Sequence, residues 1–409
     1  MNINHYQAIR FLCISSILIF GLTAQCQVRI LFDASKAETA GNADWVIDAD
    51  QHNLDYTPYA HLGGNESNAQ QIPNPTQANI NSNTPENYWT GAISAWAVDA
   101  VKLGYQVETL PYNGQITYNN SSNAQDLANY DIYVVCEPNI LFTNTEKNAI
   151  INFVQNGGGL FMISDHDNSD RNGDGYDSPY IWNDLMENNN IQTNPFGMSF
   201  DYEFFTETTS NIPNLPNDPL LHGTYGDVTS VEFYGGTSIS LSPSQNTSVK
   251  GVVFQNGFSN TGNYGVLCAY ALYENGKVVA LGDSSPADDG TGDNGDNLYD
   301  GWIEDANGNH ERLIMNATIW LADNTTATED MYTDKGEVFI SHSLNSLTFN
   351  ISKKNSLSNF YIIIYNLFGR EMHSSKLDDE IKLSLPNHGL YIYQLFNNGQ
   401  LVNTNKFIY

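Results

Sequence analysis

The stretch Gly159-Leu160-Phe161-Met162-Ile163-Ser164-Asp165-His166-Asp167 carries the strongest signal for the fold of this chain. Its apolar run follows a glycine cluster and has no polar interruption, which is typical of a strand buried on both faces of a parallel sheet. Open parallel sheets bind their ligands where the strands end. The sequence therefore places Asp165 and His166 at the expected active-site edge.

Strand and helix patterns alternate along most of the chain. Further strands are expected at 28–32, 105–110, 131–136 and 278–281, and helices at 89–103, after the capping box Thr143–Glu146, and at 313–321. This order predicts an α/β catalytic domain over 27–323, with a mostly parallel, flavodoxin/amidotransferase-like sheet and helices on both faces. Residues 324–330 have linker composition, and the alternating pattern over 331–409 predicts a small all-β sandwich.

The ends and the composition of the chain point to a secreted protein. Residues 1–26 combine Arg10, an apolar stretch and a small-residue exit, which predicts a cleaved signal peptide and no transmembrane helix in the mature form. The formal net charge is −30, so no nucleic-acid partner is expected. Cys136 and Cys268 lie in apolar runs, which favours buried free thiols over a disulfide.

The C-terminal module has a recognisable pattern. The strand-like segments 361–372, 390–395 and 406–409 resemble the type A sorting domain of the type IX secretion system. This resemblance implies export across the outer membrane of a Bacteroidetes bacterium, with the type IX secretion machinery as a partner and a secreted or cell-surface location. An immunoglobulin-like binding module is the alternative.

Four acidic residues stand at or just beyond the ends of predicted buried strands: Asp33, Glu137, Asp165 and Asp283. Parallel strands end at a common edge, so these carboxylates are expected to meet there. Crowded like charges repel unless a cation or shared protons neutralise them, which favours a divalent metal held by Asp33, Glu137 and Asp283. The alternative is that each acid caps a neighbouring loop or helix.

Two overlapping signals follow the strand at 159–163. Asp170, Asn172, Asp174 and Asp177 alternate around Gly175, an arrangement that suits calcium although the glutamate of a full EF-hand loop is missing. A solvated turn is the alternative. Asp165-His166-Asp167 combines oxygen and nitrogen donors. Asp167 is predicted as a metal ligand, and Asp165 and His166 as an acid/base pair.

Acidic loops with embedded aromatic residues follow Asp33 and Asp283. Trp45 and Trp302 are expected to stack on sugar rings, and the scarce basic residues Lys36, Arg171 and Arg312 are candidate ligands for an anionic substrate. Internal salt bridges are the alternative for the basic residues. Besides His166 and Asp165, the candidate catalytic residues are Tyr176, Tyr299 and His310.

The strand order and the turn 156–163 resemble the class I glutamine amidotransferase-like superfamily, which includes proteins of trehalose-utilisation type. That resemblance implies the fold. The chain has no Gly-x-Cys-x-Gly elbow: Glu137 follows Cys136 and Ala269 follows Cys268, so neither cysteine fits the role of the nucleophile.

Three functions are compatible with these features. The first is a carbohydrate-active enzyme of lyase type that acts on uronic-acid-containing polysaccharide oligomers by metal-assisted elimination, with calcium as the expected cofactor. The second is a metal-dependent hydrolase of glycosidic, ester or phosphodiester bonds. The third is a calcium-stabilised, non-catalytic glycan-binding protein.

Overall fold

A computed structural model describes residues 27–41, 43–47, 76–291, 302 and 308–323, together with strand segments at 338–343, 346–351, 360–366, 369–376, 381–383, 390–397 and 400–408. The predicted signal peptide and the predicted linker lie outside these residues. Within them, no helix is long and apolar enough to cross a membrane.

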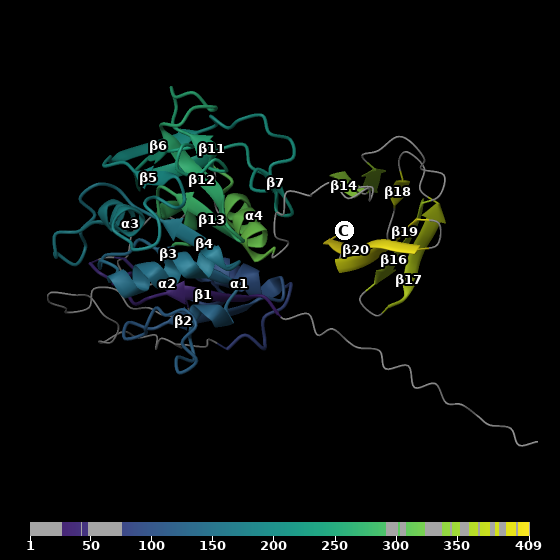
Figure 1. Cartoon of the computed structure of the whole chain (residues 1–409), viewed down its shortest axis with the longest axis horizontal. Coiled ribbons are helices and arrows are strands. Elements are labelled where there is room, and N and C mark those ends of the chain that lie inside the picture. The colour runs from purple at the N-terminus through teal and green to yellow at the C-terminus, as the bar shows by residue number, and fades with distance from the viewer. Residues whose placement is uncertain are drawn as a thin grey trace, which may run out of the picture.

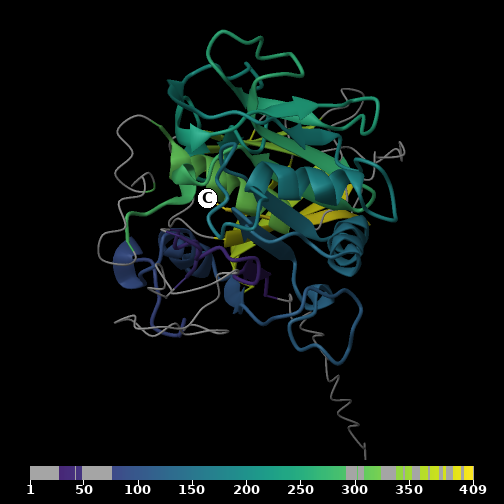
Figure 2. The ribbon, with the colours of Figure 1, turned by 90° about the vertical axis from the view of Figure 1, so that its left-hand side faces the viewer.

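The central sheet is largely parallel in one half and antiparallel in the other. Neighbouring strands of the parallel half run in the order β2 (Gln106–Leu110), β1 (Arg29–Asp33), β3 (Ile132–Cys136), β4 (Gly159–Ile163) and β13 (Gly276–Leu281). The sheet continues through antiparallel strands, which are β12 (Val266–Tyr273), β10 (Ile239–Leu241) and β5 (Met198–Phe200), with β11 (Lys250–Phe254) also on β12. Both views place β1 and β2 at one end of the sheet and the antiparallel strands at the other (Figures 1 and 2).

Two helices cover each face of this sheet. Helices α1 (Ser94–Lys102) and α4 (His310–Ala322) pack with one set of strand side chains, which includes Phe32, Val134 and Phe161. Helices α2 (Asn144–Gln155) and α3 (Ser178–Glu187) pack with the alternate set, which includes Leu31, Tyr133 and Met162. The central strands β3 and β4 are buried at every position, which is why their sequences are unbroken apolar runs.

Local signals set the boundaries of several elements. The capping box is present, because Thr143 Oγ1 accepts from Glu146 N and Thr143 N donates to the Glu146 carboxylate, so α2 begins where the sequence predicts. Cys136 and Cys268 are buried free thiols, as predicted. Short elements lie among the loops: η1 (Glu86–Tyr88), η2 (Leu127–Asn129), η3 (Ser285–Ala287), β6 (Phe205–Thr209), β7 (His222–Gly223), β8 (Gly226–Asp227) and β9 (Val231–Gly236).

The C-terminal strands are antiparallel. One sheet contains β14 (Val338–Ser343), β15 (Ser346–Ile351) and β18 (Ile381–Leu383), and the other contains β17 (Glu371–Lys376), β16 (Phe360–Asn366), β19 (Leu390–Asn397) and β20 (Gln400–Ile408). The prediction of a mixed α/β chain that ends in a small antiparallel region is confirmed. The flavodoxin/amidotransferase-like assignment and the sorting-domain assignment stay predictions.

Gly282 joins β13 to the candidate site and has no room for a side chain. Its N–H donates to the Leu267 carbonyl at 2.9 Å and its carbonyl accepts from Thr237 N at 2.8 Å. A β-carbon on Gly282 would lie 2.0 Å from the Thr237 carbonyl oxygen. The substitution Gly282→Ala is therefore expected to lower the free energy of unfolding by about 1–3 kcal/mol through overpacking. Chemical denaturation measures this change.

Gly262→Ala is the matched control, because its nearest contact for a β-carbon is a loop carbonyl at 3.2 Å. We expect this control to keep nearly wild-type stability. Equal losses in the two variants would contradict the close approach at Gly282.

Candidate functional site

Four carboxyl groups lie along the carboxyl edge of the parallel strands. Asp33 is the last residue of β1, Glu137 directly follows β3, and Asp165 and Asp283 stand two residues beyond β4 and β13. These four strands are neighbours in the order β1-β3-β4-β13. The four side chains are buried. The edge therefore concentrates negative charge away from water, which requires compensation.

Arg171 supplies positive charge at this edge. Its Nε forms an ion pair with Glu137 Oε1, and its Nη2 lies 2.9 Å from Asp165 Oδ2. The Arg171 side chain is 17% exposed. The guanidinium thus stands between Glu137 and Asp165, where the sequence predicted a divalent metal. Internal ion pairs occupy two nitrogens of Arg171, which is the alternative to substrate binding that the sequence left open.

Glu137 lies at the centre of the buried acidic set. Its Oε2 accepts from Trp45 Nε1 at 2.5 Å and from Ser284 Oγ at 3.1 Å. Burial raises the pKa of Glu137 to about 8, although the Arg171 guanidinium lowers it. Burial likewise raises the pKa of Asp165 to about 6, against the opposing effect of Arg171. Glu137 therefore keeps its proton to a higher pH than an exposed glutamate.

Asp283 is held by the backbone of the two segments beside it. Its Oδ2 accepts from Tyr234 N at 2.6 Å and its Oδ1 accepts from Ser285 N at 2.9 Å. Burial raises its pKa to about 6, although these backbone hydrogen bonds lower it. Asp283 therefore fixes β9 and η3 against the end of β13.

Asp33 belongs to a separate pair of acids. Its Oδ1 accepts from Ser35 N at 3.0 Å and from Ser35 Oγ at 2.7 Å. The buried Glu38 lies beside it, and burial together with the charge of Asp33 raises the pKa of Glu38 well above its usual value. Burial also raises the pKa of Asp33. Two adjacent buried carboxyls of this kind hold a proton between them, and the pair needs no metal to be neutralised.

His166 is the candidate catalytic group that reaches the surface. Its Nδ1 lies 2.6 Å from the Asp167 carbonyl oxygen, so Nδ1 carries the proton of the neutral ring and Nε2 holds the lone pair. Nε2 lies 3.9 Å from Asp165 Oδ2, and the side chain is 23% exposed. A partly exposed imidazole whose Nε2 holds the lone pair suits a general base.

One exposed aromatic ring lies against His166. Its ring packs edge-on against Phe204 with 4.3 Å between centroids. A β-carbon on Gly235 would lie 3.3 Å from His166 Cδ2, and Gly235 has φ +87°, so glycine allows this contact. Phe204 is 67% exposed, and the neighbouring Tyr202 and Tyr234 are also exposed. The sequence pattern did not single out these three residues, although the aromatic residues at 200–205 were a usable signal for Tyr202 and Phe204.

Loop 170–177 is folded around its own acidic side chains. Asp170 Oδ1 accepts from Asp174 N at 3.1 Å and Asp170 Oδ2 accepts from Gly175 N at 2.8 Å. Asp174 Oδ1 accepts from Tyr176 N at 3.0 Å, and Asn172 Nδ2 donates to the Asn139 carbonyl. Each of these carboxylate oxygens keeps a lone pair beyond its backbone hydrogen bond, so the loop can still coordinate a cation.

Asp177 and Asp167 have structural partners. Asp177 is the N-cap of α3, because its Oδ1 accepts from Tyr180 N at 3.0 Å. Asp167 N donates to the Glu203 carbonyl at 2.7 Å, and its Oδ2 accepts from Asn168 Nδ2 at 2.7 Å. Asp177 therefore has a structural role as a helix cap, which the sequence did not predict for it. The contact through Asp167 brings the aromatic segment 202–204 beside His166.

Burial contradicts four of the predicted roles. Trp45 and Trp302 are each 1% exposed, so the prediction that they stack on a sugar is wrong. Lys36 is buried and its Nζ lies 2.8 Å from Glu146 Oε2, which excludes a substrate contact in this conformation. His310 is 0% exposed and its Nε2 accepts from Glu232 N at 2.9 Å, so it is a structural residue rather than a catalytic one.

The other three predicted residues lie elsewhere. Arg312 Nη1 donates to the Asp227 carbonyl at 3.0 Å, which places it at the β7–β8 pair. Tyr176 is half-buried and its ring centroid lies 5.1 Å from that of Tyr180. Tyr299 lies outside the described residues.

A cavity of about 520 Å³ lies away from this edge. Its lining includes Asp131 and Gly158, which precede β3 and β4, so it opens at the amino ends of the strands. None of the residues around His166 lines it. The candidate site is therefore a surface with a buried charged floor.

Comparisons with protein-family models and with curated proteins find no match. Among solved structures, the N-terminal domain of mmIFT52 has 12% identity and a TM-score of 0.38, covering 74% of this chain and 100% of its own. A cytoplasmic protein of Salmonella typhimurium has 16% identity and a TM-score of 0.33, covering 57% and 87%. A ThuA-like protein from Parabacteroides merdae has 10% identity and a TM-score of 0.34, covering 74% and 92%. At these TM-scores the likenesses support no activity for this chain.

The buried acids predict how stability depends on pH. Their pKa values in the folded protein, about 6 for Asp165 and Asp283 and about 8 for Glu137, exceed those of the unfolded chain. Their stabilising contribution is therefore complete below about pH 4 and is lost as the pH rises through these values. We expect the melting temperature to fall between about pH 5 and pH 8.5, and Glu137→Gln to flatten the upper part of that fall.

Thermal unfolding followed by circular dichroism across this range tests the expectation. Glu187→Gln, at an exposed position at the end of α3, is the matched control and should keep the wild-type profile. A profile for Glu137→Gln as steep as that of the wild type would show that Glu137 does not titrate in this range.

Proposed function

We propose that this protein is a secreted carbohydrate-active enzyme that acts on uronic-acid-containing oligosaccharides at the surface around His166. One observation carries the proposal. His166 has its Nδ1 held by the Asp167 carbonyl and its Nε2 near the Asp165 carboxylate, while the exposed ring of Phe204 packs against it. A proton-transfer group beside exposed aromatic faces suits a sugar, whose apolar face stacks on such rings.

Elimination is the reaction that these parts support best. His166 Nε2 removes the proton next to the substrate carboxylate, and that electron pair forms a carbon–carbon double bond as the bond to the leaving sugar oxygen breaks. Water then protonates the leaving oxygen. The Asp165 carboxylate lies beneath the ring, 3.9 Å from Nε2. The aromatic surface of Tyr202, Phe204 and Tyr234 orients the sugar.

A cation completes this proposal. The substrate is anionic, the chain has a net charge of −30, and Arg171 is already paired with Glu137 and Asp165. Positive charge for the substrate carboxylate must therefore come from elsewhere, and a calcium ion in loop 170–177, which contains Arg171, would supply it. Asp170, Asn172 and Asp174 would hold that ion.

Hydrolysis is the second candidate. His166 Nε2 could instead activate a water molecule for attack on the glycosidic bond, with Asp165 beneath the ring at 3.9 Å. A glycan-binding protein without catalysis would need no such proton-transfer group. Elimination and hydrolysis differ in the mass of the product. Binding without catalysis differs from both because it gives no product and does not require His166.

Export is proposed on the sequence alone. The N-terminal 26 residues would direct the chain across the inner membrane, and the C-terminal module would be the signal for the type IX secretion machinery. A protein exposed to the outside of the cell would meet polysaccharide fragments there.

His166 is the residue whose replacement tests catalysis. Incubation of the mature protein with acidic and neutral oligosaccharides should give products without added water and with an absorbing double bond. His166→Ala is expected to lower turnover by about 10²–10⁴-fold, the usual contribution of a general base. Mass spectrometry and ultraviolet absorbance measure both effects.

His222→Ala is the control, because His222 pairs with Asp227 in the β7–β8 segment. Products one water heavier would favour hydrolysis, and binding without turnover would favour the lectin-like function. Wild-type turnover by His166→Ala would remove His166 from the mechanism.

The calcium assignment is tested by stability. A cation that binds only the folded protein stabilises it by about 2.7 kcal/mol at a hundred times its dissociation constant. Chelation should therefore lower the melting temperature. The double variant Asp170→Asn/Asp174→Asn loses two charges and keeps one acceptor oxygen at each position, so its calcium response should be smaller. A variant with the full wild-type response would contradict a calcium site in this loop.

A further inference from the structure

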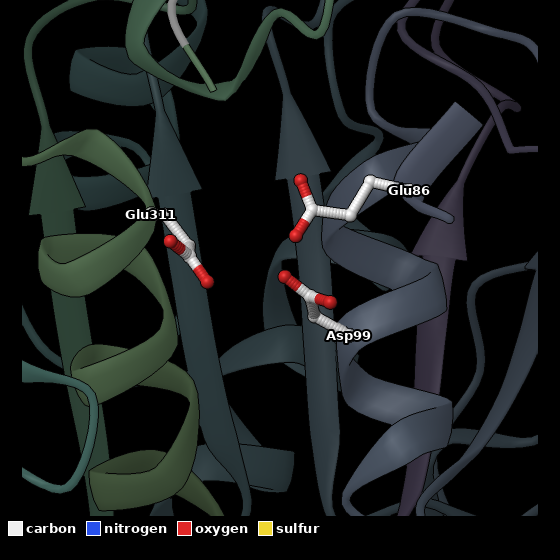
Figure 3. Close-up of side chains that lie close together, drawn as sticks. All are labelled: Glu86, Asp99 and Glu311. Carbon is white, nitrogen blue, oxygen red and sulfur yellow. The ribbon is translucent and has the colours of Figure 1, made fainter. Parts of the chain in front are cut away.

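A second acidic group joins three elements that are distant in sequence. Glu86 lies in η1, Asp99 in α1 and Glu311 in α4. Each offers one carboxylate oxygen, and these oxygens all lie within 4.8 Å of one another. Figure 3 shows the three carboxyl groups turned toward a common space. None of them belongs to the site around His166.

Positive side chains neutralise this group only in part. Lys102 Nζ lies 2.9 Å from Asp99 Oδ1 and 3.9 Å from Glu86 Oε1. Arg312 also acts on Glu311, whereas Asp289 adds a further negative charge near Glu86. The acids outnumber the bases here, and mutual repulsion among them, after burial, raises the pKa of Glu86 to about 7.

Buried polar atoms at this group lack hydrogen bonds. Asp99 is 2% exposed, and its Oδ2 has no hydrogen-bond partner, nor does Glu86 Oε2. Trp302 is 1% exposed and faces the Asp99 carboxylate, whose pKa it lowers, yet its Nε1 completes no hydrogen bond of normal geometry. Buried polar atoms are almost always paired with protein, water or an ion. These atoms therefore point to an occupant of the space between them.

The donor set identifies the class of occupant. All three ligands are carboxylate oxygens, which select hard cations. Calcium accepts a variable number of oxygen ligands in a flexible geometry, whereas magnesium demands a near-ideal octahedron. Three carboxylate oxygens within 4.8 Å of one another, from three separate elements, therefore suit calcium better. The indole N–H of Trp302 is suited to a water molecule on such an ion.

We propose that Glu86, Asp99 and Glu311 form a calcium site that ties η1 and α1 to α4. These helices cover the same face of the sheet, where Trp96 of α1 donates to Thr318 of α4 at 2.9 Å. The ion joins α1 to α4 through Asp99 and Glu311. The loop after Asp283 is fixed with it, because Asp289 Oδ2 accepts from Ala95 N at 2.7 Å. The site is structural, and it is independent of loop 170–177.

Terbium luminescence is the direct test, because Tb³⁺ replaces calcium and emits when a nearby tryptophan is excited. Trp302 faces this site and stacks on Trp96 with 6.4 Å between centroids. Excitation of tryptophan in the wild-type protein should give terbium emission that calcium competes away. Glu86→Gln/Glu311→Gln should lose that emission, whereas Asp170→Asn/Asp174→Asn, the variant of the other loop, should keep it.

Stability provides the second measurement. Calcium should raise the melting temperature of the Asp170→Asn/Asp174→Asn variant, and this rise should be absent when Glu86→Gln/Glu311→Gln is added. Undiminished emission or an undiminished rise in the glutamine variant would overturn the proposal. If that variant does not fold, Trp302→Phe decides in the otherwise wild-type chain: unchanged terbium emission overturns the site, and reduced emission with a retained calcium response supports it.

Discussion

The ion pairs of Arg171 with Glu137 and Asp165 are the interaction on which the candidate site depends. Parallel strands bring their carboxyl ends to one edge, and here four neighbouring strands each bring an acid. Burial of such a set costs several kcal/mol per uncompensated charge. Arg171 reduces this cost by pairing with two of the acids at once.

One segment supplies most of this site. Residues 164–177 leave β4, place Asp165 and His166 at the edge, return Arg171 over the buried acids and end at the N-cap of α3. The site consequently has two layers. A charged floor is closed to solvent, and above it His166 and the exposed rings of Tyr202, Phe204 and Tyr234 meet the surface. Any chemistry on a large substrate takes place in the upper layer, while the floor sets the charge beneath His166.

The molecule balances its acidic charge in several local ways. The Arg171 guanidinium compensates the charge of Glu137 and Asp165. Asp33 and Glu38 share a proton. The Lys102 ammonium compensates part of the charge of Asp99 and Glu86. The way in which each acidic group is compensated depends on its burial and on the basic side chains near it. For Asp33 and Glu38, burial outweighs the nearby charge of Lys36, and the raised pKa keeps the pair from ionising fully.

Periodicity and local capping were sufficient to predict β4, the start of α2 and the strand-end positions of the four acids, because these depend on residues close in sequence. They could not reveal that Trp45, Trp302, Lys36 and His310 are buried, since burial of a loop depends on segments far away in the chain. The antiparallel half of the sheet and the partners of Arg171 were likewise set by tertiary contacts. Glu86, Asp99 and Glu311 come from three separate elements, and only the packing of η1, α1 and α4 on one face brings them together. Sequence thus determined which chemical groups reach the sheet edge, whereas the tertiary structure decided which of them meet water and which meet one another.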